Sequence, residues 1–184
     1  MKACILAAVL IGTVAAAPVW AAPRQLSETE IAVARIQIVD LINRYALIHN
    51  TDDPQGYANL FTEDGEFGPL KGRAAILEMA KGEVSKMRAP GITSDEGPYR
   101  FGFMRSLIIN PVIDIIDATH AKGVSYLQVV VPDLDNGNVP TILFMGTYQD
   151  EYRKVGGKWL IAKRVSFGTF ANPALGKKLG LGGG

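Results

Sequence analysis

Two histidines are the side chains of this sequence that titrate near neutral pH. His49 lies near the end of an apolar helical pattern, and Tyr45 lies one turn before it on the same face. An imidazole there could act as a general base or acid, and a tyrosine hydroxyl could protonate or hydrogen-bond a developing oxyanion. Alternatively, His49 caps the helix C-terminus, where the helix dipole favours it, and Tyr45 belongs to the core. His120 lies in a turn and is expected to be solvated.

The sequence lacks the motifs that bind common cofactors and metals. It has no phosphate-binding loop, no dinucleotide glycine fingerprint after a strand, and no His-x-x-x-His or paired-cysteine motif. Lys and Arg number 19 against 18 Asp and Glu, so no basic excess is available for nucleic acid. We therefore expect a protein that uses no cofactor or metal and binds no nucleic acid.

Residues 1–21 have the pattern of a secretory signal peptide. Lys2 precedes an apolar run over 3–17, Pro18 ends that run, and small residues suit cleavage after Ala21. The run is shorter than the ~20 residues that span a bilayer, so we expect cleavage and no membrane insertion afterwards. The mature protein is expected to be periplasmic or secreted, and cleavage would remove Cys4, the only cysteine.

Three helices are expected in the first half of the mature chain. Ser27 and Glu30 have the spacing of a capping box, and apolar residues then recur at helical intervals to about Asn50. Asp53–Pro54 starts a second, short helix that is predicted to end near residue 61. The third helix is expected over 74–87.

The second half of the chain has the composition of β-strands. A loop at 88–98 is followed by four stretches rich in Val, Ile, Tyr, Phe and Thr, at 100–117, 121–132, 139–155 and 158–170. Residues 135–138 and 156–157 are predicted hairpin turns, and Pro111 indicates a bend or an edge position in the first strand.

Helices followed by strands predict an α+β fold, with three helices packed on one face of a strongly curved, mainly antiparallel sheet. Residues 62–65 are expected to form a turn, with a short strand beginning at 66. No repeat or linker is visible. We expect one domain over 22–179 and a disordered glycine tail at 180–184.

Four segments of this layout resemble the SnoaL-like family of the nuclear-transport-factor-2-like superfamily. They are 43–65, 71–76, 104–114 and 146–164. The resemblance implies a cone-shaped α+β barrel with an internal apolar pocket, assembled as a homodimer or homotrimer. Relatives include scytalone dehydratase, hexachlorocyclohexane dehydrochlorinase, polyketide cyclases, steroid isomerases and diarylpropane formaldehyde lyases. They share cofactor-free proton transfer on small hydrophobic substrates, while other members only bind ligands.

In the dehydratase and dehydrochlorinase relatives, an Asp near the end of the first helix orients a catalytic His on the facing strand. The matching positions here hold Asn50 and Ser106, which cannot perform that acid–base chemistry. His49 could replace the missing base, and Arg164, which resembles a retained family arginine, could stabilise charge on an oxygen. Asn50 and Ser106 could instead hydrogen-bond the substrate or satisfy each other.

Tyr99, Arg105 and Tyr126 are further candidates for substrate binding. Each tyrosine could equally be a core or rim aromatic, and Arg105 could be a structural ion-pair partner that faces away from Ser106. The leading hypothesis is a cofactor-independent lyase that acts on a small hydrophobic, aromatic molecule by elimination or by C–C cleavage such as deformylation. The alternatives are an isomerase or cyclase in the same pocket, and a ligand-binding protein that has lost catalysis.

Overall fold

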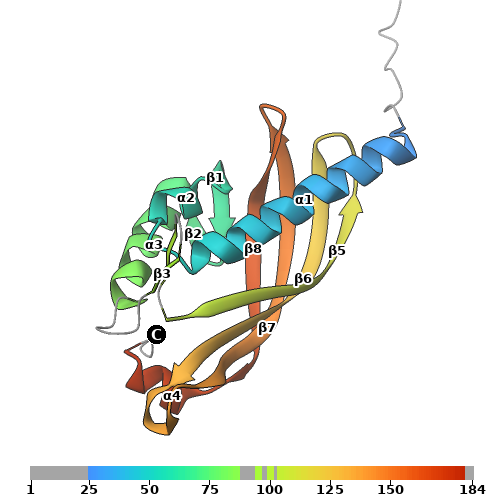
Figure 1. Ribbon diagram of the computed structural model, residues 1–184. Coiled ribbons are helices and arrows are strands. Elements are labelled where there is room, and N and C mark those ends of the chain that lie inside the picture. The colour runs from blue at the N-terminus through green and yellow to red at the C-terminus, as the bar shows by residue number, and fades with distance from the viewer. Residues whose placement is uncertain (1–24, 88–93, 97–98, 102, 181–184) are drawn as a thin grey trace, which may run out of the picture.

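The computed structural model describes residues 25–87, 94–96, 99–101 and 103–180. Helices come first and a large sheet follows, as predicted (Figure 1). The helices are α1 (Glu28–His49), α2 (Pro54–Ala58), α3 (Arg73–Met87) and α4 (Pro173–Lys178), with a 3-10 turn at Leu134–Asn136. The strands are β1 (Phe61–Phe67), β2 (Leu70–Lys71), β3 (Ser94–Glu96), β4 (Tyr99–Phe101), β5 (Arg105–Ile115), β6 (His120–Asp133), β7 (Val139–Val155) and β8 (Lys158–Ala171).

The expected signal peptide and the last four residues of the glycine tail lie outside the described residues. Among the described residues, no helix has both the length and the apolarity needed to cross a bilayer.

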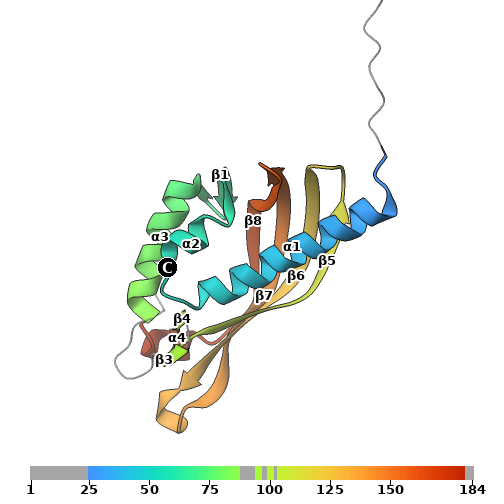
Figure 2. The ribbon, with the colours of Figure 1, turned by 45° about the horizontal axis from the view of Figure 1, so that its top comes forward.

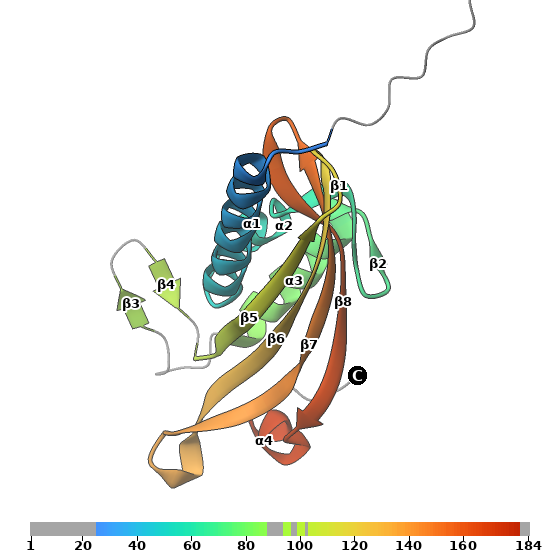
Figure 3. The same ribbon diagram turned by 90° about the vertical axis from the view of Figure 1, so that its right-hand side faces the viewer.

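The main sheet has six strands in the order β2-β1-β8-β7-β6-β5. Strands β5 to β8 form the predicted antiparallel meander, and β1 adds to it in parallel with β8. The sheet curls around α1, but its edge strands β2 and β5 do not pair, so the barrel stays open (Figure 3). α2 and α3 pack together beside β1 (Figure 2).

Two local predictions near β1 differ from the structure. α2 ends at Ala58 rather than near residue 61, and residues 62–65, expected to turn, lie within β1. Phe61 on one side of this stretch and Glu66 and Phe67 on the other pair with β8, and the pairing register shifts between Phe61 and Glu66, so residues 62–65 form an irregular part of the strand. Gly65 lies in this irregular stretch, where a Cβ would come within 3.0 Å of the Thr62 carbonyl oxygen.

Two further differences concern loops and the chain end. The predicted loop at 88–98 contains β3, which pairs with β4, and its other residues lie outside the described part. The short helix α4, which was not predicted, starts at Asn172 and Pro173, the same kind of start that Asp53–Pro54 provides for α2.

Pro111 lies in the edge strand β5, at a register shift, as its sequence context indicated.

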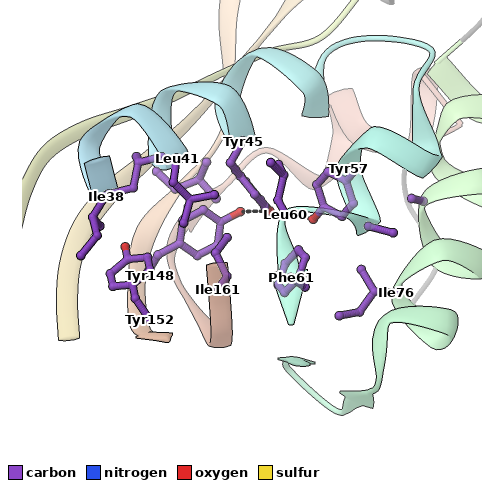
Figure 4. Packing of buried hydrophobic residues seen from close by; sticks show 14 of the residues in the cluster. Ile38, Leu41, Tyr45, Tyr57, Leu60, Phe61, Ile76, Tyr148, Tyr152 and Ile161 are labelled. Carbon is purple, nitrogen blue, oxygen red and sulfur yellow. Dashed lines mark hydrogen bonds between the residues drawn. The ribbon is translucent and has the colours of Figure 1, made fainter. Parts of the chain in front are cut away.

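α1 supplies one side of the core. Its buried residues repeat at helical spacing: Ala34, Ile38, Leu41, Ile42 and Tyr45. They pack against the inner face of the sheet, where Tyr148, Tyr152 and Ile161 are buried (Figure 4). In β6, buried and exposed residues alternate, with Ser125 and Leu127 buried on the inner face and Tyr126 exposed on the outer face.

The capping box at the start of α1 should contribute measurably to stability. The Ser27 hydroxyl accepts a hydrogen bond from the Glu30 backbone N–H at 3.3 Å, and the Glu30 carboxylate accepts one from the Ser27 N–H at 2.9 Å. Ser27→Ala is expected to lower the free energy of unfolding by about 1 kcal/mol in urea denaturation, because a backbone donor loses its partner. Thr29→Ala, at an exposed position of the same turn, is the control and should change it by less.

Candidate functional site

The end of α1 and the start of β5 meet in a hydrogen-bonded group of three side chains. The His49 Nδ1 atom lies 3.0 Å from the Ser106 hydroxyl oxygen. The Asn50 side-chain oxygen accepts a hydrogen bond from the Ser106 backbone N–H at 2.7 Å. Asn50 and Ser106 are buried and His49 is half-buried. Two positions 56 residues apart in the chain are thus fixed against each other, and His49 is held beside them.

His49 is surrounded by aromatic rings. Its ring stacks on Tyr45 at a centroid distance of 5.7 Å and lies 5.5 Å from the ring of Tyr57. Burial, together with the positive charge of Arg164, lowers the pKa of His49 from 6.5 to about 4. The imidazole is therefore neutral at pH 7, with one nitrogen able to accept a proton.

Three tyrosine hydroxyls meet next to this histidine. The Tyr45 hydroxyl lies 2.7 Å from that of Tyr57 and 3.4 Å from that of Tyr148. Burial raises the pKa of both Tyr45 and Tyr148 well above the ordinary value. The two phenols therefore remain protonated at neutral pH and can donate hydrogen bonds.

Arg164 lies inside the core, where it forms an ion pair with Asp150. It is completely buried, and its Nε and Nη2 atoms each donate to a different Asp150 carboxylate oxygen at 2.7 Å. The Tyr152 hydroxyl donates to the same carboxylate at 2.6 Å. The guanidinium carbon lies over the rings of both Tyr45 and Tyr148, at 4.0 and 4.2 Å from their centroids, and these two rings are nearly perpendicular to each other.

This environment keeps Arg164 permanently charged. Burial alone would lower the pKa of the guanidinium, but the Asp150 carboxylate raises it well above its ordinary value. Its remaining nitrogen, Nη1, is buried and has no hydrogen-bond partner among the described residues. Arg164 therefore has a spare donor, and its positive charge contributes to lowering the pKa of the His49 imidazole.

Taken together, the group has the parts of a proton-transfer site. It combines a neutral imidazole, protonated phenols and a fixed buried cation. A base next to a cation that stabilises a developing negative charge is suited to removing a proton from carbon. Within the described ranges, no group of three or more His, Cys, Asp or Glu side chains is placed to hold a metal ion.

The structure places three predicted site residues away from this group or leaves them undefined. Tyr126, a candidate for substrate binding, lies on the outer face of β6 and is 56% exposed, because strand alternation sends it opposite to Ser125 and away from the group around His49. Arg105 is half-buried and donates to the carbonyl oxygen of its neighbour Met104 at 3.1 Å. For Tyr99 only the backbone, in β4, is described.

Four residues that lie in the site were not among those predicted from the sequence: Tyr57, Tyr148, Asp150 and Tyr152. Three of them lie at alternate positions of β7 and therefore share one face, a pattern that the sequence already contains. Tyr57, on α2, has no comparable signal. His120, expected to be solvated, is exposed and hydrogen-bonds Asp117 in its turn.

The fold and the site together define an α+β protein with an acid–base group enclosed between the first helix and a curled sheet. Residues 30–165 match the SnoaL-like domain. Because this match covers most of the sequence, the chain belongs to the SnoaL-like family.

Several solved structures are similar to this chain. Rv3472, a protein of unknown function from Mycobacterium tuberculosis, is 30% identical over 77% of this chain and 75% of its own, with a TM-score of 0.63. A putative scytalone dehydratase from Novosphingobium aromaticivorans is 22% identical over 79% and 91%, with a TM-score of 0.64. The type 2 hexachlorocyclohexane dehydrochlorinase LinA is 16% identical over 79% and 92%, with a TM-score of 0.61. The last two show similarity of fold, and no curated protein matches the chain significantly.

Proposed function

We propose that this protein is an enzyme that converts a small hydrophobic, aromatic molecule by acid–base chemistry without a cofactor, and that its reaction is a lyase reaction. The observation that carries the proposal is the placement of His49, neutral and hydrogen-bonded to Ser106, within the field of the buried Arg164. The signal-peptide pattern of residues 1–21 supports export, so we propose that the enzyme works in the periplasm or outside the cell.

In an elimination, the C–H bond of the substrate would break toward the imidazole nitrogen of His49. The electron pair of that bond would form the new double bond, and the leaving group would depart with the pair of its own bond. The proton held by His49 would then pass to the leaving group or to water, which returns the imidazole to its neutral form. The Arg164 charge and the protonated Tyr45 hydroxyl, which lies 2.7 Å from the Tyr57 hydroxyl, would stabilise negative charge that develops on a substrate oxygen.

In C–C cleavage such as deformylation, His49 would take the proton of a hydroxymethyl O–H, and the pair of that bond would form the carbonyl of formaldehyde. The pair of the broken C–C bond would form a double bond while a leaving group departs from the next carbon. Two structural neighbours with this fold are named as a putative dehydratase and a dehydrochlorinase, which supports an enzyme that converts a small molecule.

A second function, ligand binding without catalysis, is favoured by one observation. The positions of the family dyad hold Asn50 and Ser106, and the Asn50 oxygen is used by the Ser106 backbone. A site whose polar groups satisfy each other can hold a ligand without reacting with it.

Mass spectrometry with a panel of aromatic dimers and small cyclic compounds tests the two functions. The mature protein is incubated with each compound without added cofactor. Loss of water, formaldehyde or hydrogen halide from a compound supports the lyase. A product of unchanged mass indicates an isomerase or cyclase, and saturable binding with no product supports the binding protein.

A further inference from the structure

Ser106 and His49 have the arrangement of a serine nucleophile and its base. The Ser106 hydroxyl oxygen lies 3.0 Å from the Nδ1 atom of His49, and among the described residues this nitrogen is its only hydrogen-bond partner. His49 is the last residue of α1, and the side chain of the next residue, Asn50, accepts the Ser106 backbone N–H at 2.7 Å. Two hydrogen bonds between α1 and β5 therefore fix the pair.

The hydrogen-bonding capacity of the two groups decides where their protons lie. A serine hydroxyl has one proton to donate, and Ser106 is only 4% exposed. If Nδ1 of His49 carried the imidazole proton, it would donate to the hydroxyl, and the hydroxyl proton would be buried without an acceptor. Ser106 therefore donates to an unprotonated Nδ1, and the neutral imidazole carries its proton on Nε2. In this tautomer His49 can take the hydroxyl proton directly, as the base of a serine nucleophile does.

We propose that Ser106 is a nucleophile that His49 activates, and that the protein hydrolyses esters of small phenols as a further activity. The imidazole lies beside the rings of Tyr45 and Tyr57, at centroid distances of 5.7 and 5.5 Å, so an aromatic ester meets aromatic side chains at the pair. His49 is half-buried, which gives the buried Ser106 its connection to solvent.

The surroundings of Ser106 favour esters whose leaving group departs easily. The Ser106 backbone N–H donates to Asn50, so this N–H is not available to a negative oxygen on the substrate. The positive charge of Arg164, which acts on His49, stabilises negative charge near the pair. A phenolate leaves more easily than an alkoxide or an amide anion, so phenyl esters need the least stabilisation of the intermediate.

The reaction takes place in two stages. In the first, the Ser106 oxygen attacks the carbonyl carbon of the ester, its proton moves to Nδ1 of His49, and one carbonyl electron pair moves onto the carbonyl oxygen. When that pair returns, the bond to the phenol oxygen breaks with its own pair, and the phenolate takes the proton from Nδ1. In the second stage water attacks the acyl carbon in the same way, the carboxylic acid leaves, and Ser106 regains its proton through His49.

Acylation by 4-nitrophenyl acetate tests the proposal. The mature wild-type protein is incubated with the ester, and the acetylated residue is located by mass spectrometry of its peptides. The acetyl group is expected on Ser106, together with release of nitrophenolate. Ser106→Ala should remove the acetyl group from that peptide, and His49→Asn should slow acylation of Ser106 by about 10²-fold or more, because the base is lost.

Ser125 provides a matched control. It is also buried, at 3% exposure, but its hydroxyl has no hydrogen-bond partner among the described residues, so Ser125→Ala should leave acylation of Ser106 unchanged. Circular dichroism checks that the variants are folded. Wild-type protein unfolded in urea should not be acylated at Ser106, because the reactivity depends on the contact with His49.

Acetyl groups on lysines alone, or equal acylation of Ser106 in the wild type and in His49→Asn, would overturn the proposal. The location of the acetyl group in the wild type decides even if a variant fails to fold. The compound panel tests the proposed lyase reaction separately, so either proposal can fail while the other stands.

Discussion

Asp150→Asn is expected to lower the free energy of unfolding by about 3–5 kcal/mol, because it leaves a buried cation without its counter-charge. Arg164 is completely buried and takes two hydrogen bonds of 2.7 Å to this carboxylate. Asparagine keeps the shape of the side chain but supplies no charge. The guanidinium stays protonated at every pH at which the protein is folded, so the variant must bury a positive charge that has no counter-charge. The Tyr152 hydroxyl also loses a charged acceptor.

Equilibrium unfolding in urea, followed by circular dichroism, measures the loss. Asp64→Asn removes an exposed ion pair with Arg153 and should have a far smaller effect. The double variant Asp150→Asn with Arg164→Met removes both charges and is expected to regain much of the lost stability. If the single variant is as stable as the wild type, the buried Arg164 charge does not need the Asp150 carboxylate, which would contradict the prediction.

Much of the fold follows from local sequence patterns. The capping box and the apolar stripe define α1, and alternation with glycine turns defines β6, β7 and β8. The place of β1 could not be predicted in this way. Its residues 62–65 favour a turn locally, and they lie within a strand because the residues on either side, Phe61 and Glu66, pair with β8 about 100 residues later in the chain.

The site shows the same division between local and distant information. Helical spacing places Tyr45 beside His49, and the sequence contains that spacing. The Asp150–Arg164 pair depends on the register of the β7–β8 hairpin. Counting back from the turn at 156–157 would place Asp150 opposite Lys163. A register shift between Glu151 and Tyr152 moves it by one residue to face Arg164, and one such step exchanges the two faces of a strand.

His49→Asn is expected to reduce kcat on the substrate found by the compound panel by about 10²–10⁴-fold, the usual contribution of a general base. Asparagine can keep the hydrogen bond to Ser106, because its amide group reaches the position of the imidazole Nδ1, which lies 3.0 Å from the hydroxyl oxygen. It has no titratable nitrogen. Binding of the substrate should therefore change less than kcat.

The second histidine of the chain provides the control. His120 is exposed in a turn with Asp117, so His120→Asn should leave kcat unchanged. Steady-state kinetics on the two variants makes the comparison. Equal activity of His49→Asn and wild type would remove His49 from the mechanism.

The pH dependence follows from the pKa of His49, which burial and the charge of Arg164 lower from 6.5 to about 4. A base must be unprotonated to act, so activity should persist as the pH falls through 6.5 and should decline only as it approaches 4. The lowered pKa also makes stability depend on pH. Between pH 6.5 and about 4, His49 is protonated in the unfolded chain but not in the folded protein, so the free energy of unfolding falls as the pH is lowered. His49→Asn lacks this proton and should lose less stability than the wild type over the same interval. A wild-type acid limb near 6.5, with equal acid sensitivity of the two proteins in urea unfolding, would show that the imidazole is solvated and outside the field of Arg164.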